Sequence, residues 1–325
     1  MRVREGKELL RAMKPYARED RTKSWWALGS TLTLITGLLV VAAWPLAWPI
    51  RLAASVVAGL VVVRGFIIYH DFMHGALLKG SLVAKAIMSA YGVLVLTPPR
   101  VWRQTHNYHH ANNAKIVGSH VGSYPMMTVA MWEKASPSAR RWYRVARHPL
   151  TVFLGYGGIF LYGMCISGFL RRPSRNWDSA LALVLHVALA VTLTLTLGWQ
   201  GLLFVLVLPL VVACGLGAYL FYAQHNFEGM HLQPREEWSF ARAALESSSF
   251  MEMGPVMNWF TGNIGYHHVH HLNAAIPFYR LPEAHAAIPE LAAARRTSLT
   301  PRAIAACFRL KLWDPEQGQM VPYPR

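Results

Sequence analysis

The sequence predicts an all-α integral membrane protein with four transmembrane helices, two re-entrant or interfacial helices, and a cytoplasmic cap that carries a metal site. Composition and charge pattern support this fold class. Hydrophobic residues make up 54% of the 325 residues and charged residues 15%, whereas a soluble domain carries about 25% charged residues. The mean hydropathy is +0.25. Long uncharged stretches alternate with short basic segments, which is typical of membrane spans joined by loops.

The chain is expected to form a single domain, residues 1–325, divided into three regions. Residues 1–24 form a basic N-terminus, residues 25–222 the membrane region, and residues 223–325 the cap. The first 23 residues contain eight Lys or Arg and four acidic residues. Because positively charged flanks stay in the cytoplasm, the N-terminus is expected on that side of the membrane.

Two apolar runs, 25–48 and 51–69, follow the N-terminus. Tryptophans lie at both ends of the first run, as expected of side chains at the two membrane surfaces. As a helix, residues 25 to 44 would cover about 28 Å, close to the hydrocarbon thickness of a bilayer. The two runs are therefore expected to cross outward and back, which places His70 at the cytoplasmic surface.

The next two apolar runs are expected to be re-entrant or interfacial. Run 82–96 has only about 15 residues, contains Lys85 and stops at Pro98 and Pro99, so it is short for a span. Run 150–170 has several arginines on each side, so both of its ends are expected in the cytoplasm.

Runs 179–197 and 202–222 are separated only by Gly198-Trp199-Gln200-Gly201, which predicts a tight helical hairpin. This hairpin completes four spans and returns His225 to the cytoplasmic side. No uncharged run after residue 222 is long enough to span, so residues 223–325 are expected to form the cap.

Histidine is the unusual residue type in this chain. Ten of the 15 histidines fall in four clusters near the ends of predicted spans. Spacings of i, i+4 and of i, i+3, i+4 place imidazoles on one face of a helix, where they can bind a metal together. Imidazole suits iron, copper, zinc and nickel, and nine or ten ligands suit two ions. The clusters are His70 and His74; His106, His109 and His110; His225; and His267, His268, His270 and His271.

Within the last cluster, His267, His270 and His271 repeat the spacing of the second cluster, so His268 is a possible additional ligand. A metal transporter or sensor is the rival interpretation from another class of protein. A transporter would hold its ligands inside the spans, whereas the predicted spans contain only His186 in their middle.

A histidine that binds a metal usually donates its other ring N–H to an acceptor. Asp71 and Glu228 are the predicted acceptors, because each lies close in sequence to a clustered histidine. Asn226 and Asn263 are further candidates. The alternative for both acids is a solvated carboxylate at the membrane surface.

Three of the clusters match, in order and spacing, the histidine boxes HxxxH, HxxHH and HxxHH of the membrane fatty acid desaturase superfamily. The segments Phe221-Tyr-Ala-Gln-His-Asn-Phe-Glu228 and Thr261-Gly-Asn-Ile-Gly-Tyr-His-His-Val-His-His-Leu272 also resemble those of acyl-lipid desaturases of the Δ12 and Δ5 kind. The resemblance implies two iron ions, O2 as co-substrate, and desaturation of an acyl chain. It implies that the catalytic iron ligands are His70, His74, His106, His109, His110, His225, His267, His270 and His271.

The resemblance also implies partners. The two electrons would come from an external ferredoxin or cytochrome, because nothing here resembles the HPGG haem motif of a fused cytochrome b5 domain. The substrate would be a lipid-linked or thioester-linked acyl chain. Arg100, Trp102 and Arg103 are the predicted contacts of its head group, or else anchors at the membrane interface. The net charge of +16 suits an acidic carrier or anionic membrane lipid, and membrane topology explains most of it, so no nucleic-acid partner is expected.

Several reactions share these boxes and remain alternatives. They are acyl hydroxylation, carotenoid ketolation or hydroxylation, and alkene-forming decarboxylation of fatty acids. Hydrocarbon hydroxylases carry asparagine-tyrosine-x-glutamate-histidine near the position of His225, and the Phe-Tyr-Ala-Gln found here disfavours that branch. No motif encodes the chain length of the substrate or the position of a double bond.

Overall fold

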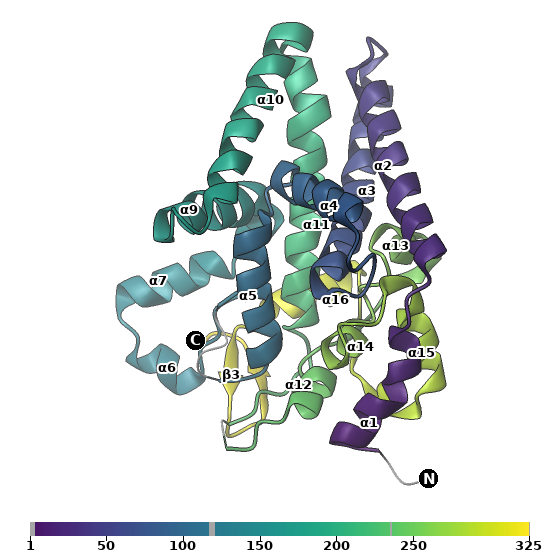
Figure 1. Ribbon diagram of the computed structural model, residues 1–325. Coiled ribbons are helices and arrows are strands. Elements are labelled where there is room, and N and C mark those ends of the chain that lie inside the picture. The colour runs from purple at the N-terminus through teal and green to yellow at the C-terminus, as the bar shows by residue number, and fades with distance from the viewer. Residues whose placement is uncertain (1–3, 117–120, 235, 325) are drawn as a thin grey trace.

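The computed structural model describes residues 4–116, 121–234 and 236–324. A tall bundle of helices stands on a cap, which forms the lower part of the view in Figure 1. In the bundle, α3 and α11 approach closely because Gly59 has no side chain, and a Cβ atom there would lie 2.7 Å from the carbonyl oxygen of Pro209. The bundle consists of α2 (Arg21–Ala43), α3 (Trp48–His74), α10 (Trp177–Gly201), the π-helix η3 (Leu202–Val207) and α11 (Leu208–Gln224).

Within the described residues, three helical segments are long and apolar enough to cross a membrane: Arg21–Ala43, Trp48–His74 and Trp177–Gln224. The third has 48 residues, which as a straight helix would be about 72 Å long, more than twice the hydrocarbon core. The chain reverses direction at Gly198, which adopts φ of 69° and ψ of −173°. Glycine can take this conformation because it has no Cβ atom. The predicted hairpin is therefore present: after the turn, η3 packs against α10 and leads into α11 (Figure 1).

The outer surface of the bundle is apolar, as a bilayer requires. Val184 and Leu195 on α10 are strongly exposed. Exposed tryptophans occur at both ends of the bundle, with Trp199 at the hairpin turn and Trp26 near the cap. Side chains of this kind gather where hydrocarbon meets water. The chain is a membrane protein with three to four candidate spans.

The two shorter apolar runs lie at the base of the bundle. α4 (Leu82–Leu94) and α5 (Pro99–Asn112) meet at 89°, which makes them a broken span or a re-entrant loop. The run around residues 150–170 folds as α8 (Pro149–Phe153), the π-helix η2 (Tyr156–Ser167) and α9 (Gly168–Arg171). Among the described residues, this second run does not form a helix that qualifies as a span.

The cap is built from short elements, and it corrects the all-α prediction in one respect. Four strands of three residues form a parallel pair, β1 with β2, and an antiparallel pair, β3 with β4. Strands this short show no alternation that a sequence pattern could reveal. The cap elements are α1 (Gly6–Met13), η1 (Lys14–Ala17), α6 (Val129–Lys134), α7 (Pro137–Ala146), α12 (Phe240–Glu246), β1 (Phe250–Glu252), α13 (Gly254–Phe260), α14 (His267–Leu272), η4 (Phe278–Arg280), α15 (Leu281–Ala287), η5 (Pro289–Ala293), β2 (Arg296–Ser298), α16 (Pro301–Arg309), β3 (Leu312–Asp314) and β4 (Gln319–Val321).

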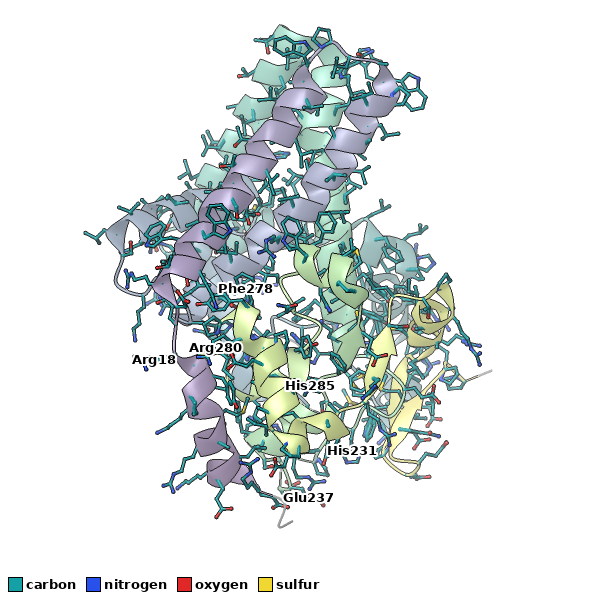
Figure 2. All side chains as sticks on the ribbon, turned by 90° about the vertical axis from the view of Figure 1, so that its right-hand side faces the viewer. Arg18, His231, Glu237, Phe278, Arg280 and His285 are labelled. Atoms are coloured by element: carbon teal, nitrogen blue, oxygen red, sulfur yellow. The ribbon has the colours of Figure 1, made fainter. Side chains whose placement is uncertain are left out.

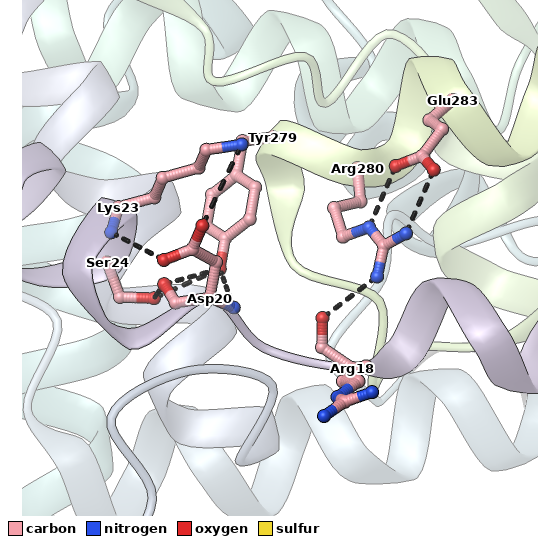
Figure 3. Close-up of polar contacts among 7 residues, drawn as sticks. All are labelled: Arg18, Asp20, Lys23, Ser24, Tyr279, Arg280 and Glu283. Carbon is pink, nitrogen blue, oxygen red and sulfur yellow. Dashed lines mark hydrogen bonds and ion pairs between the residues drawn. The ribbon is translucent and has the colours of Figure 1, made fainter.

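The N-terminal segment packs against the C-terminal third of the chain, so it is part of the cap. The Arg280 guanidinium donates to the carbonyl oxygens of Pro15 and Arg18, each at 3.0 Å (Figures 2 and 3). The Tyr279 hydroxyl accepts from the backbone N–H of Asp20 at 2.9 Å and lies 3.1 Å from the Ser24 hydroxyl (Figure 3). These contacts fix the entry into α2.

Removing the Tyr279 hydroxyl should loosen this junction. Tyr279→Phe is expected to destabilise the protein by about 1 kcal/mol, because the hydroxyl is shared by Asp20 and Ser24. Trypsin should then cleave after Arg18 and Arg21 faster than in the unmodified protein. Tyr162→Phe is the matched control, since Tyr162 is exposed and makes no hydrogen bond with a described residue. Equal cleavage rates in the two variants would contradict this account.

Candidate metal centre

Four segments that are far apart in the sequence bring histidines together where the bundle meets the cap. The first is the last turn of α3, which ends after His74 because Gly75 adopts the left-handed C-cap conformation, with φ of 72°. The second is α5, and the third is His225, directly after α11. The fourth is α14, which has only six residues and packs against α12.

Nine buried or half-buried histidines form two separate sets. Within each set, the candidate ligand nitrogens all lie within 4.8 Å of one another. The structure thus brings together every histidine that was predicted to bind iron. The five-histidine set is His70, His74, His106, His110 and His270, and the four-histidine set is His109, His225, His267 and His271.

Protons alone cannot satisfy these nitrogens. The Nε2 atom of His106 lies 3.0 Å from the Nε2 atoms of both His70 and His110. A neutral ring nitrogen carries either one hydrogen or one lone pair, so it can make only one good hydrogen bond. In the four-histidine set the Nε2 contacts close into a ring, with distances between 2.9 and 3.3 Å. A metal ion that accepts a lone pair from every member satisfies each set, so the residues fit two ions.

The protonation of the cap histidines supports metal binding. Burial lowers the pKa of His225 to about 4. Burial, and then the neighbouring imidazoles, hold the pKa values of His267, His270 and His271 well below the usual 6.5. These rings are therefore neutral near pH 7, and their lone pairs are available to a metal.

Two acceptors contact histidines of the sets at Nδ1, the ring nitrogen that does not face the other histidines. Asp71 Oδ1 lies 3.0 Å from His70 Nδ1, and Asp71 Oδ2 accepts from the backbone N–H of Phe278 at 2.6 Å. His225 Nδ1 lies 2.9 Å from the carbonyl oxygen of Ser247. The structure thus brings Asp71 to a ligand, as predicted, whereas the Ser247 contact was missed because a backbone carbonyl has no residue-type signal.

Two other candidates lie apart from both sets. Glu228 is exposed and has no contact with a histidine among the described residues. His268 is fully buried, but its Nε2 lies 3.1 Å from Nδ1 of His285. Burial, and then His285, lower the pKa of His268 to about 3. His268 is thus paired with another cap helix and faces away from the metal sets.

The proposed head-group residues have different surroundings. Trp102 is buried and stacks on the His106 ring, with ring centroids 4.3 Å apart, so it forms a wall of the metal site. Arg100 donates to the carbonyl oxygen of Arg175 at 3.2 Å and lies over the Trp177 ring. Arg103 is exposed on α5. The two arginines are accessible to a head group, whereas the buried Trp102 is not.

The sequence of this chain is similar to those of known desaturases over most of its length. The fatty acid desaturase family model matches residues 43–303. A fatty acid desaturase of Bacillus subtilis is 32% identical over 98% of this chain and 90% of its own length. An sn-1 acyl-lipid omega-3 desaturase (ferredoxin) of Synechocystis is 27% identical over 89% of this chain and 82% of its own length. An sn-1 oleoyl-lipid 12-desaturase of Synechocystis is 25% identical over 71% of this chain and 66% of its own length.

Neighbouring histidines on α14 should differ in their effect on metal content. His270→Gln removes a member of the five-histidine set, so the metal-to-protein ratio should fall from about two to about one. His268→Gln is the matched control, because His268 is equally buried but contacts His285. Elemental analysis of the purified proteins measures both ratios. Equal metal loss in the two variants would contradict the assignment of His270, but not His268, to a metal-binding set.

The two predicted acceptors should also differ. Asp71→Asn leaves one carboxylate contact unsatisfied, so metal affinity should weaken about 10–100-fold, as measured by competition with a chelator. Glu228→Gln should leave metal affinity unchanged, since Glu228 is exposed and away from the sets. Weaker metal binding in Glu228→Gln, or none of the expected weakening in Asp71→Asn, would refute the orienting role of Asp71.

Proposed function

Because this chain belongs to the fatty acid desaturase family, we propose that it uses two iron ions and O2 to desaturate acyl chains of membrane lipids. It is an oxidoreductase that acts on fatty acyl chains. The observation that carries the proposal is the pair of histidine sets, five and four, whose nitrogens converge at the end of the bundle. The finer parts of the proposal concern the metal, the electron donor, the substrate and the side of the membrane.

Iron is supported by the chemistry of the ligands. Nine neutral imidazoles and no thiolate suit iron, and a donor set of this size suits two ions. When bound, two irons supply the activation of O2 that removes two hydrogens from an acyl chain, while two external electrons and two protons complete the reduction of O2 to water. Ferredoxin is the favoured electron donor, since two relatives carry it in their names, and a cytochrome is the alternative.

The protein's own residues prepare the site. Asp71 and the Ser247 carbonyl hold His70 and His225 in the tautomer that presents Nε2 to the metal. Trp102 covers His106 and helps to exclude water. Burial of the imidazoles keeps competing solvent away from a reactive centre.

The side of the membrane follows from charge. The basic segment at the start of the chain packs on the cap, and positive segments stay in the cytoplasm. We infer four spans, α2, α3, α10 and α11, with the cap and the metal site on the cytoplasmic side. The other two apolar runs would then be re-entrant or interfacial.

The substrate is proposed to be lipid-linked, because relatives are named as acyl-lipid and oleoyl-lipid desaturases. A thioester-linked chain is the alternative. Arg100 and Arg103 would contact an anionic head group, since Arg103 is exposed one turn before His106 and Arg100 lies beside Arg175. Membrane phospholipids offer such a group in their phosphate.

The fatty acid profile of an expressing host tests this function. A host that supplies iron and a working electron carrier should gain an acyl species two hydrogens lighter than its precursor. The new species should be absent with His270→Gln and present with His268→Gln, which is outside the metal sets. A product that has gained oxygen, or one with a shorter chain, would contradict desaturation and indicate hydroxylation or decarboxylation at the same site.

A further inference from the structure

A small cavity lies against the four-histidine set. Its volume is about 30 Å³, and its wall includes His109 and His225 of that set but no member of the five-histidine set. Arg147, Tyr222 and Phe221 also line it. A volume of this size holds one or two water-sized molecules. Whatever enters it lies beside the ion that has fewer protein ligands.

Arg147 brings an unbalanced positive charge to this cavity. Its side chain is 1% exposed, and it donates to the Pro125 carbonyl at 2.9 Å and to Asn226 Oδ1 at 2.6 Å. No carboxylate among the described residues forms an ion pair with it. A second positive charge lies close by, because Lys311 Nζ donates to the Arg147 carbonyl at 2.8 Å. A buried cation without a counter-charge is costly.

Two buried donors at the cavity also lack an acceptor. The Arg147 Nε–H and the Tyr222 hydroxyl have no hydrogen-bond partner among the described residues. The guanidinium carbon lies 5.0 Å from the centre of the Tyr222 ring, and both residues line the cavity. Leaving two buried donors unpaired is unfavourable, because each has lost its hydrogen bonds to water. A ligand that accepts from both would remove this cost.

We propose that Arg147 and Tyr222 bind a small inorganic anion, of the size of hydroxide or a halide, beside the four-histidine set. The small size of the cavity favours a small anion over a phosphate or a lipid carboxylate with its chain. A water molecule would satisfy the two donors but would leave the charge of Arg147 unbalanced. The donor pair exists without metal, and only the role of the anion, as a counter-charge next to an iron, rests on the proposed function.

Bromide is the probe that tests the site, because it replaces chloride and can be located by its X-ray absorption edge. Full-length, iron-loaded protein is transferred into gluconate and titrated with bromide at constant ionic strength, while thermal unfolding is followed. We expect a saturable rise in the unfolding temperature. Crystals soaked in bromide should show one anomalous peak between Arg147 and Tyr222.

Two tyrosines of the cavity wall provide a matched pair of variants. Tyr222→Phe keeps the ring and removes one donor, so bromide affinity should fall about tenfold. Tyr124→Phe should leave it unchanged, because the Tyr124 hydroxyl already donates to the Ala218 carbonyl at 3.3 Å.

Three results would overturn the inference: no bound bromide, equal affinity in Tyr222→Phe, or bromide bound to iron away from Arg147. Iron content and acyl products measured on the same preparation separate the two proposals. If the preparation contains two irons and forms a new double bond but does not bind bromide, the anion site is refuted and the proposed desaturase function stands.

Discussion

Nitrogen atoms of nine histidines face one another across two small spaces, at distances that protons alone cannot satisfy. In the four-histidine set, each Nε2 has two Nε2 neighbours between 2.9 and 3.3 Å away, yet a neutral ring nitrogen can make only one good hydrogen bond. Burial keeps the cap rings neutral, so protonation does not resolve the conflict. Metal ions bound in the two sets would remove this conflict, and their binding free energy would then become part of the folding free energy.

The rest of the fold serves to hold these rings at the edge of a membrane. α3 and α5 supply rigid helices on which a spacing of four residues directs two rings to one side. The Gly198 hairpin returns the chain so that His225 follows α11 at the same end of the bundle. α14 is too short to be stable alone, so the cap and the N-terminal segment, joined through Arg280 and Tyr279, must keep it in place.

The sequence predicted the parts of this site that have a spacing or a composition. The histidine clusters, the apolar helices of the bundle and the hairpin at Gly198 all carry such a signal. Contacts between distant backbone and side-chain atoms carry none, which is why the Ser247 carbonyl at His225 was not predicted. For the same reason His268 remained a possible additional ligand in the sequence analysis, although it pairs with His285. Trp102 was predicted to contact a head group or to anchor at the membrane interface. Its stacking on His106 was not predicted, because it depends on how α5 is rotated.

The central claim is that one chain holds two ions in unequal histidine sets. Mössbauer spectroscopy on protein loaded with iron-57 tests it most directly, since the spectrum responds to the ligands of each iron. We predict two signals of equal area, one from an iron with five imidazoles and one from an iron with four. A single signal from one iron per chain, or iron in only one of the two sets at full loading, would contradict the account.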